Sequence, residues 1–374
     1  MRKSAREKPG LVDLWAFAPV FALVLIGVWL VFDASYAKAA DFGWTNKDSW
    51  YFAKKQIISA IIGLGVMFAV SKVRLATLSK YANSLVVVSI ALLVLVFVPG
   101  IGYKANGAWR WIRVHGFTFQ PSEIAKLALV IYLAKFLSQS RSVARRIDSR
   151  WVMPAIVTAM IVVLILGEPD LGTTIAIAFT CLAVLFAAGA RKWHLGAMVA
   201  AGAFLVWVAI KLEPYRMERV WVWLDPWKYR YGDGYQIVHS LIAIGTGGLF
   251  GVGPCEGREK LYIPAASTDF IFSTLGEEFG LIACLALLAL FLFFIYKGLD
   301  VARRAKNTHA NLLAVGVTSM IGLQALINVA VVSSSIPATG VPLPFISYGG
   351  TSLILTLAGV GIILAVSRQR SESP

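Results

Sequence analysis

Runs of about 20 mostly apolar residues recur along the whole chain, and they restrict its possible folds more than any other feature. A helix that crosses a bilayer needs roughly 20 such residues, because lipid offers no partner for an unsatisfied backbone polar group. Only 15% of the 374 residues are charged, whereas soluble domains carry about 25%. The sequence therefore predicts an all-α, polytopic integral membrane protein, folded as a single membrane domain over residues 1–374.

The apolar runs predict about ten transmembrane helices. The first run follows a basic segment but is long and lacks a small-residue cleavage site, which favours a retained helix over a signal peptide. The ten runs lie near residues 14–34, 55–71, 82–99, 120–137, 152–167, 171–189, 193–212, 270–296, 311–332 and 345–367.

Basic residues concentrate in every second connection, which places both chain ends in the cytoplasm. Short cytoplasmic loops are enriched in Lys and Arg. The net charge of +15 thus reflects topology and contact with anionic headgroups. No nucleic acid partner is expected, because no nucleic-acid-binding fold accompanies the charge. The basic residues assigned to the inside are at positions 2, 3, 6, 8, 72, 74, 80, 141, 145, 146, 150, 191, 192, 297, 303, 304, 306, 368 and 370.

One predicted outer connection, residues 213–269, is far longer than the others. Connections of this length are usually functional or disordered. Its residues 214–223 mix basic side chains with tryptophans, as interfacial amphipathic helices do, although the tryptophans alone would also fit an anchoring aromatic belt. The glycine-rich stretch 245–253 lacks the strand and helix that a dinucleotide site requires. A tight loop against a lipid-facing cleft is the favoured interpretation.

Ionisable residues near membrane depth are costly to bury, so each is a functional candidate. Glu123 and Lys126 are spaced i and i+3 on one helix face, where they either pair with each other or hold a substrate. Glu168 and Asp170 occupy a tight turn between two spans. They suit either a cation site or, more simply, a helix cap.

Asp269 stands where the long connection re-enters the membrane. Partial desolvation there would raise its pKa toward the range of a general base. The local sequence alone favours the other interpretation, a helix N-cap, because Asp is strongly preferred at that position. Residues 337–350 hold three prolines and three glycines. Irregular backbone at membrane depth is tolerated only beside protein or a water-filled cavity, so this stretch should line a cleft.

These segments, in this order, closely resemble the shape, elongation, division and sporulation (SEDS) family of RodA, FtsW and SpoVE over nearly the whole chain. Residues 214–219 and 225–227 are closer to the division or sporulation branch than to the elongation branch. Ser267 departs from the family, which commonly has His there, so no histidine base is assigned. The resemblance is carried by residues 120–126, 168–172, 234–236, 245–253, 268–272 and 342–350.

The resemblance implies a peptidoglycan glycosyltransferase that polymerises lipid II at the outer face of the bacterial cytoplasmic membrane. Asp269 resembles the family's essential aspartate, which would accept a proton from the attacking sugar hydroxyl. The leaving lipid pyrophosphate needs cationic stabilisation. The candidates are Arg110, Lys126, Arg216 and Arg219, with Glu123 positioning Lys126, or a divalent cation (Mg or Mn) bound by Asp269 and Asp170.

The family usually works among membrane lipids with a class B penicillin-binding protein, a single-span transpeptidase. The main rival function is a lipid II flippase, because ten spans with buried charges also suit transport. Transporters often contain repeated halves, and no internal repeat is visible here. A purely structural scaffold would leave the charges at membrane depth unexplained.

Overall fold

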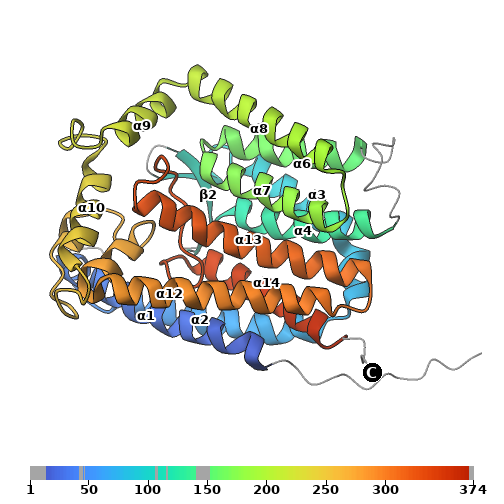
Figure 1. The fold of residues 1–374 in the computed structure, drawn as a ribbon, viewed down its shortest axis with the longest axis horizontal. Coiled ribbons are helices and arrows are strands. Elements are labelled where there is room, and N and C mark those ends of the chain that lie inside the picture. The colour runs from blue at the N-terminus through green and yellow to red at the C-terminus, as the bar shows by residue number, and fades with distance from the viewer. Residues whose placement is uncertain are drawn as a thin grey trace, which may run out of the picture.

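Ten helices of 16 to 33 residues run side by side and form the body of the computed structural model, which describes residues 14–41, 45, 47–105, 108–114, 117–139 and 152–369 (Figure 1). The predicted all-α membrane fold is confirmed. The basic residues predicted inside at 2–8, 141–150 and 370 lie outside the described residues. The ten helices are α1 (Leu14–Asp41), α2 (Tyr51–Ser71), α3 (Leu75–Leu95), α4 (Pro121–Ser138), α6 (Val152–Gly167), α7 (Leu171–Ala187), α8 (Lys192–Leu212), α12 (Ile271–Arg303), α13 (Thr308–Val332) and α14 (Gly350–Ser367).

Each predicted span coincides with one of these helices, although they differ in how well they suit lipid. In the described part of the chain, seven helices are long and apolar enough to cross a membrane, and α6 and α7 are shorter apolar helices. Helix α4 has 18 residues but contains the charged residues Glu123, Lys126 and Lys135. Most of α4 is buried. Neighbouring helices therefore shield Glu123 and Lys126 from lipid, whereas Lys135 near the other end of α4 is only partly buried.

Two helix starts differ from the prediction. Helix α3 begins at Leu75 rather than near residue 82, because its polar first turns are helical without being apolar. Helix α14 begins at Gly350 rather than near residue 345. The residues before it form turns and irregular backbone, with prolines at positions 337, 342 and 344. Hydropathy locates a span but does not locate the end of its hydrogen-bonded helix.

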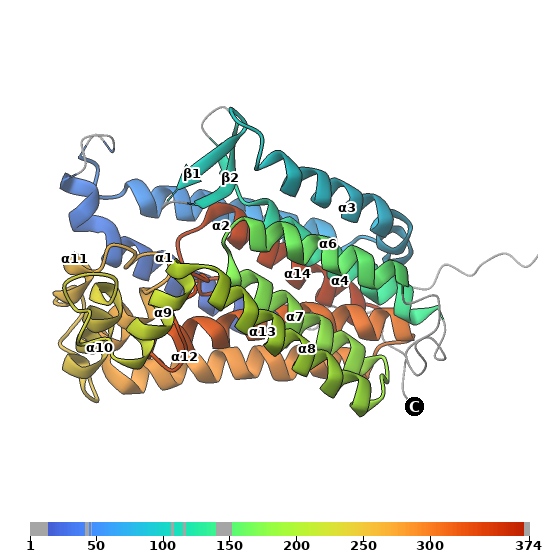
Figure 2. The ribbon, with the colours of Figure 1, turned by 90° about the horizontal axis from the view of Figure 1, so that it is seen from above.

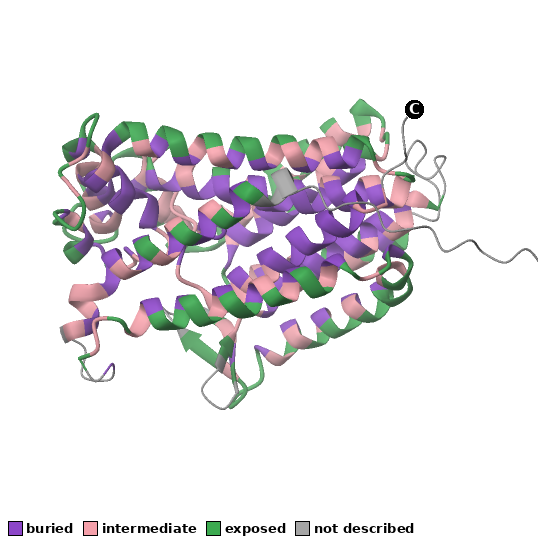
Figure 3. Ribbon diagram, turned by 90° about the horizontal axis from the view of Figure 1, so that it is seen from below, coloured by how far each residue is buried: buried purple, intermediate pink, exposed green. Residues whose placement is uncertain are grey.

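The centre of the bundle lies around α13 and α14, and α8 stands at its edge. The apolar segments of α13 and α14 are 67% and 72% buried, whereas that of α8 is 0% buried (Figure 3). Side chains of α8 such as Phe204 and Leu205 are exposed in the isolated chain. Apolar side chains on such a surface are suited to contact with lipid.

A small antiparallel sheet, which the sequence analysis did not predict, lies between the end of α3 and the start of α4 (Figure 2). It consists of β1 (Gly102–Ala105), β2 (Ala108–Val114) and β3 (Phe117–Phe119) in the order β1-β2-β3. In strand β2 the side chain of Ile112 is buried, and those of residues 109–111 and 113 are exposed or half-buried. The sheet turns the connection between α3 and α4 into a fixed element that carries Arg110.

The long connection between α8 and α12 folds into three helices, α9 (Pro214–Leu224), α10 (Tyr235–Gly247) and α11 (Glu259–Tyr262), at one end of the bundle (Figure 1). The predicted helix at 214–223 is therefore present as α9. Its position at a membrane surface stays a prediction. The glycine-rich stretch ends α10 and turns sharply, so that Gly251 packs against the α12 backbone near Gly280, where α12 is kinked.

Replacing Gly247 by Ala is expected to lower the stability of the fold by about 1–3 kcal/mol, because there is no room for a methyl group. A Cβ there would lie 1.9 Å from the carbonyl oxygen of Gly276 in α12. Gly245 on the same helix has nothing within 4 Å of such a Cβ. Thermal unfolding in detergent should show a lower midpoint for Gly247→Ala than for Gly245→Ala. Equal midpoints would contradict the close approach of α10 and α12.

Candidate active site

The predicted pairing of Glu123 and Lys126 occurs at the start of α4 and reaches a third residue. The Lys126 ammonium donates to Glu123 Oε1 (2.6 Å) and to Gln324 Oε1 on α13 (2.7 Å). Both charged side chains are at most 5% exposed. Gln324 in turn donates to the carbonyl of Pro342 (3.1 Å). The ion pair therefore connects α4 to the irregular segment before α14.

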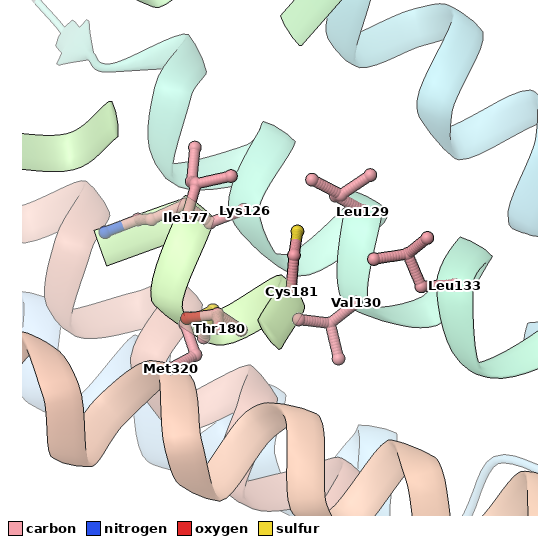
Figure 4. Close-up of a pocket in the computed structure, with 8 residues that line it drawn as sticks. All are labelled: Lys126, Leu129, Val130, Leu133, Ile177, Thr180, Cys181 and Met320. Carbon is pink, nitrogen blue, oxygen red and sulfur yellow. The ribbon is translucent and has the colours of Figure 1, made fainter. Parts of the chain in front are cut away.

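A small cavity lies beside Lys126, among α4, α7 and α13 (Figure 4). The Lys126 nitrogen is on one side of it, and aliphatic side chains such as Leu129 and Leu133 are on the other. Apart from Lys126 and Thr180 its lining is apolar. Asp269 does not line it. We therefore place the reacting groups elsewhere, at the end of the bundle that carries Asp269.

Asp269 precedes α12 but does not cap it, so the N-cap interpretation is wrong. The cap position of α12 is Phe270, and no side chain caps this helix. A turn closed by the Phe270 N–H bond to the Ala265 carbonyl (3.2 Å) places Asp269 ahead of the first helical turn. Its side chain is half-buried, and its carboxylate has no hydrogen-bond partner within the described residues. The carboxylate therefore retains its capacity to accept a proton.

Arg110 and Asp269 converge on Gly340 in the irregular segment. A Cβ at Gly340 would lie 3.4 Å from Asp269 Oδ2 and 4.0 Å from Arg110 Nη1. Burial raises the pKa of Asp269 to about 6; the positive charges of Arg110 and Arg219 oppose the shift, and the negative charge of Asp170 adds to it. A carboxyl with such a pKa is mostly ionised at neutral pH and is a stronger base than an exposed aspartate.

Arg110 is held in place by the turn between α6 and α7. Its Nε donates to the carbonyl of Glu168 (2.9 Å), and its Nη2 donates to the carbonyl of Pro169. Two of the three guanidinium nitrogens are thus engaged, and Nη1 is the one near Gly340. A guanidinium fixed on one edge can present its other edge to an anion.

Glu168 and Asp170 have different roles in this turn. Asp170 caps α7, because Oδ1 accepts the N–H of Thr173 (3.0 Å) and Oδ2 accepts its hydroxyl (2.9 Å), as the simpler interpretation predicted. The Glu168 carboxyl is fully buried, and neither oxygen has a partner in the described chain. Burial, with the nearby charge of Asp170, raises the pKa of Glu168 to about 9 despite Arg110. Glu168 is therefore neutral at pH 7.

The two arginines of α9 lie in different places. Arg219 donates to the carbonyl of Ala338 (2.5 Å) and to the Tyr215 hydroxyl, and it influences the charge state of Asp269. Arg216 donates to the carbonyls of Ala209 (3.1 Å) and Leu166 (3.3 Å), near the ends of α8 and α6. The fold therefore brings Arg110 and Arg219 to Asp269, whereas Arg216 joins helix ends.

Polar residues of α13 and of the segment before α14 complete the site, and the sequence analysis did not select them. Asn328 Nδ2 donates to the carbonyls of Asp269 (2.7 Å) and Val341 (2.8 Å). The Ser347 hydroxyl donates to the carbonyl of Thr268 (2.5 Å). The spacing i, i+4 of Gln324 and Asn328 within an apolar span is a signal that could have identified them.

A second buried cluster of charges holds the segment that leads to Asp269. The Lys260 ammonium of α11 donates to Asp33 Oδ1 of α1 (2.7 Å) and to Glu278 Oε1 of α12 (2.5 Å). Burial alone would lower the pKa of Lys260, but hydrogen bonds to the two carboxylates outweigh it, so its pKa is raised. Backbone N–H groups of Cys255 and Gly257 also donate to Glu278. These hydrogen bonds hold residues 255–260 against α1 and α12.

The described side chains do not form a complete metal site by themselves. The described residues contain no cluster of three or more His, Cys, Asp or Glu side chains suited to a metal ion. Asp170 uses both carboxylate oxygens for Thr173. A Mg²⁺ ion shared with a bound phosphate group needs only one or two carboxylates. Of the two predicted ligands, Asp269 fits that arrangement better, because each Asp170 oxygen already accepts a bond from Thr173.

A family model described as cell cycle protein, for FtsW, RodA and SpoVE, matches residues 14–372. The chain belongs to this family. The expectation from the sequence motifs is thereby confirmed, and the family accounts for nearly every described element.

Relatives and solved structures agree with this assignment. Stage V sporulation protein E of Bacillus subtilis is 41% identical over 364 residues, which cover 95% of this chain and 97% of that protein. The probable peptidoglycan glycosyltransferase FtsW of Geobacter sulfurreducens is 37% identical over 365 residues, covering 97% and 96%. These names are compatible with the predicted division or sporulation branch.

Two solved structures share the fold of this FtsW/RodA/SpoVE family member. RodA of Thermus thermophilus superposes with a TM-score of 0.71 at 29% identity, covering 97% of this chain and 98% of RodA. A chain from a study of how a peptidoglycan synthase complex coordinates polymerization and crosslinking superposes with a TM-score of 0.79 at 32% identity, covering 97% and 99%.

Proposed function

We propose that this protein is a peptidoglycan glycosyltransferase that polymerises lipid II into glycan strands. The observation that carries the proposal is the half-buried Asp269 carboxylate, which caps no helix and lies near Arg110 at the end of the bundle. Names of relatives support the same activity. Asp269 and Arg110 thus provide the carboxylate and the guanidinium that this reaction requires, close to each other at Gly340.

The reaction moves one proton and one glycosyl group. The Asp269 carboxylate accepts the proton of a sugar hydroxyl on the acceptor while that oxygen forms a bond to the anomeric carbon of the donor. The bond from that carbon to the lipid pyrophosphate breaks, and the pyrophosphate leaves with the electron pair. Arg110 and Arg219 offset the negative charge that develops on it.

Two other predicted substrate contacts take different parts in this proposal. Lys126 is buried and bound to Glu123 and Gln324, so it orients the segment before α14 rather than the pyrophosphate. Arg216 supports the helix ends on which α9 rests. A divalent cation, if one takes part, would be held by Asp269 and would supply further neutralisation of the negative charge.

The setting of the reaction is proposed from topology and relatives. The positive-inside rule places Asp269 on the outer side of the bacterial cytoplasmic membrane, where α9 would lie in the interface. A solved structural neighbour comes from a complex that couples polymerization to crosslinking. By that analogy the partner is a class B penicillin-binding protein. The names of the relatives favour division or sporulation over elongation as the process served.

The decisive test is incubation of the purified protein with lipid II in detergent, with and without its transpeptidase partner. Polymer of increasing length on a gel is the expected result. The rival flippase function makes a different prediction, namely movement of lipid II across vesicles containing the protein and no polymer under any condition. That pair of results would replace the polymerase proposal.

A further inference from the structure

Asn328 ties the Asp269 backbone to a second segment of the site. Its side-chain amide, 1% exposed, donates one hydrogen bond to the Asp269 carbonyl (2.7 Å) and one to the Val341 carbonyl (2.8 Å). The orientation of the amide is fixed by chemistry, since the reversed amide would place its oxygen against two carbonyl oxygens.

The Asp269 carbonyl depends on this bond because α12 does not use it. The N–H of Ser273 bonds to the carbonyl of Phe270 instead (3.0 Å). A backbone carbonyl buried without a partner is costly, so loss of Asn328 would allow the Asp269 peptide to rotate toward another donor. Because the carbonyl and the carboxylate are attached to the same Cα, a shift of the residue 269 backbone toward another donor would displace the carboxylate.

Two further hydrogen bonds join the residues before Asp269 to the segment before α14, and neither of them involves Asp269 itself. The Ser347 hydroxyl donates to the Thr268 carbonyl (2.5 Å), and the N–H of Tyr348 donates to the Ser267 carbonyl (2.8 Å). These bonds fix the residues before Asp269. The Asn328 amide is the described contact that fixes the peptide of Asp269 directly.

The Asn328 side-chain oxygen gives independent evidence that an amide is needed at this position. Oδ1 is buried and has no partner in the described part of the chain. An unpaired buried acceptor costs about 1–3 kcal/mol. An apolar side chain of similar shape would avoid that cost, but it could not bind the two carbonyls.

We infer that Asn328 is a positioning residue for the proposed glycosyl transfer. Its amide bridges the carbonyls of Asp269 and Val341 and so fixes the position at which the Asp269 carboxylate meets the acceptor hydroxyl. The inference rests on the proposed function. Asn328 is too buried to touch the substrate, so it acts through the backbone of Asp269 and Val341. A displacement of about 1 Å in a catalytic group can reduce turnover about 10²-fold.

The test compares steady-state polymerisation of lipid II by the wild-type protein and two variants. Asn328→Leu has nearly the same size and removes both donors. Asn328→Gln keeps the amide but carries its donors one methylene further. Both variants are expected to lower kcat about 10- to 100-fold while the KM for lipid II changes less than about threefold.

Thr318→Val is the matched control on the same helix. Its buried hydroxyl packs against Gly298 of α12 and not against the Asp269 segment. It is expected to retain full kcat, with thermal unfolding and gel filtration confirming that every variant is folded. If Asn328→Leu does not fold, Asn328→Gln decides the question, because it keeps the polar group in the core.

Four results would overturn the inference. The first is a wild-type kcat in a folded Asn328→Gln or Asn328→Leu protein, and the second is a rise in KM with kcat unchanged. The third is an equal loss of kcat in Thr318→Val. The fourth is failure of both Asn328 variants to fold, which would make the role of Asn328 structural. Absence of polymer from the wild-type protein overturns the proposed function as well. Polymer from wild type and variants alike overturns only the role of Asn328.

Discussion

Replacing Asp269 by Asn is expected to reduce lipid II polymerisation by about 10²- to 10⁴-fold, the range of a lost general base. The amide has nearly the same shape but cannot accept the proton of the acceptor hydroxyl. Because the Asp269 side chain makes no capping bond to α12, the fold should tolerate the change. The measurement is the initial rate of glycan formation, with thermal unfolding as a check on folding.

Two further substitutions of aspartates serve as controls for Asp269→Asn. Asp48→Asn changes an exposed carboxylate that pairs with Lys54, and it should leave the rate unchanged. Asp170→Asn keeps a residue that caps helices well, so α7 should persist and the rate should fall little. A folded Asp269→Asn protein that polymerises like the wild type would show that Asp269 is not the base.

The rate should also depend on pH with a defined sign. The base must be ionised to act, and burial raises the pKa of Asp269 to about 6. The value of kcat/KM should therefore rise as pH increases through about 6, and it should fall about tenfold per unit below that value.

Arg110→Gln provides the comparison for this pH profile. The charge of Arg110 holds the pKa of Asp269 down, so its removal should raise that pKa and move the acidic limb of the profile to higher pH. A limb that stays in place, or moves to lower pH, would contradict the proximity of these two groups.

Replacing Lys260 by Met is expected to destabilise the fold by about 3–5 kcal/mol, because two buried carboxylates lose their common partner. The Lys260 side chain is 1% exposed, and Asp33 and Glu278 on either side of it are 0% exposed. Unfolding of the detergent-solubilised protein by heat or by denaturant measures the change in stability. Adding Asp33→Asn and Glu278→Gln should recover part of the lost stability, since the unpaired charges are then removed.

Lys54→Met is the matched control for Lys260→Met. Lys54 forms an ion pair with Asp48, but the two side chains are 62% and 34% exposed. Water screens such a pair, so its loss should cost at most about 1 kcal/mol. Equal losses for the two lysine variants would show that the Lys260 cluster contributes no more than a surface pair.

The buried cluster around Lys260 also has a functional consequence. It anchors α11, and α11 precedes the turn that presents Asp269. Activity should therefore be lost in Lys260→Met at temperatures below those at which the helices of the bundle unfold. The helical signal and the polymerisation rate, measured over the same temperature range, would reveal the difference.

The sequence by itself determined the ten helices, and through the family resemblance it predicted Asp269 as the candidate base. Spans follow from hydropathy because lipid forces each backbone polar group to bond within its own helix. The Glu123–Lys126 pair and the Asp170 cap were also predictable, because their partners lie three residues away in the chain. Local spacing is sufficient for contacts of this kind.

The tertiary structure decided which residues surround Asp269. The Arg110 edge faces Gly340, Arg219 reaches Ala338, and Asn328 bonds to the Asp269 carbonyl, each across a long separation in sequence. It also showed that Asp269 does not cap α12 and that Glu168 is buried without a partner among the residues that the structure describes. Such facts depend on how helices pack, and packing depends on the shapes of many side chains at once rather than on any one segment.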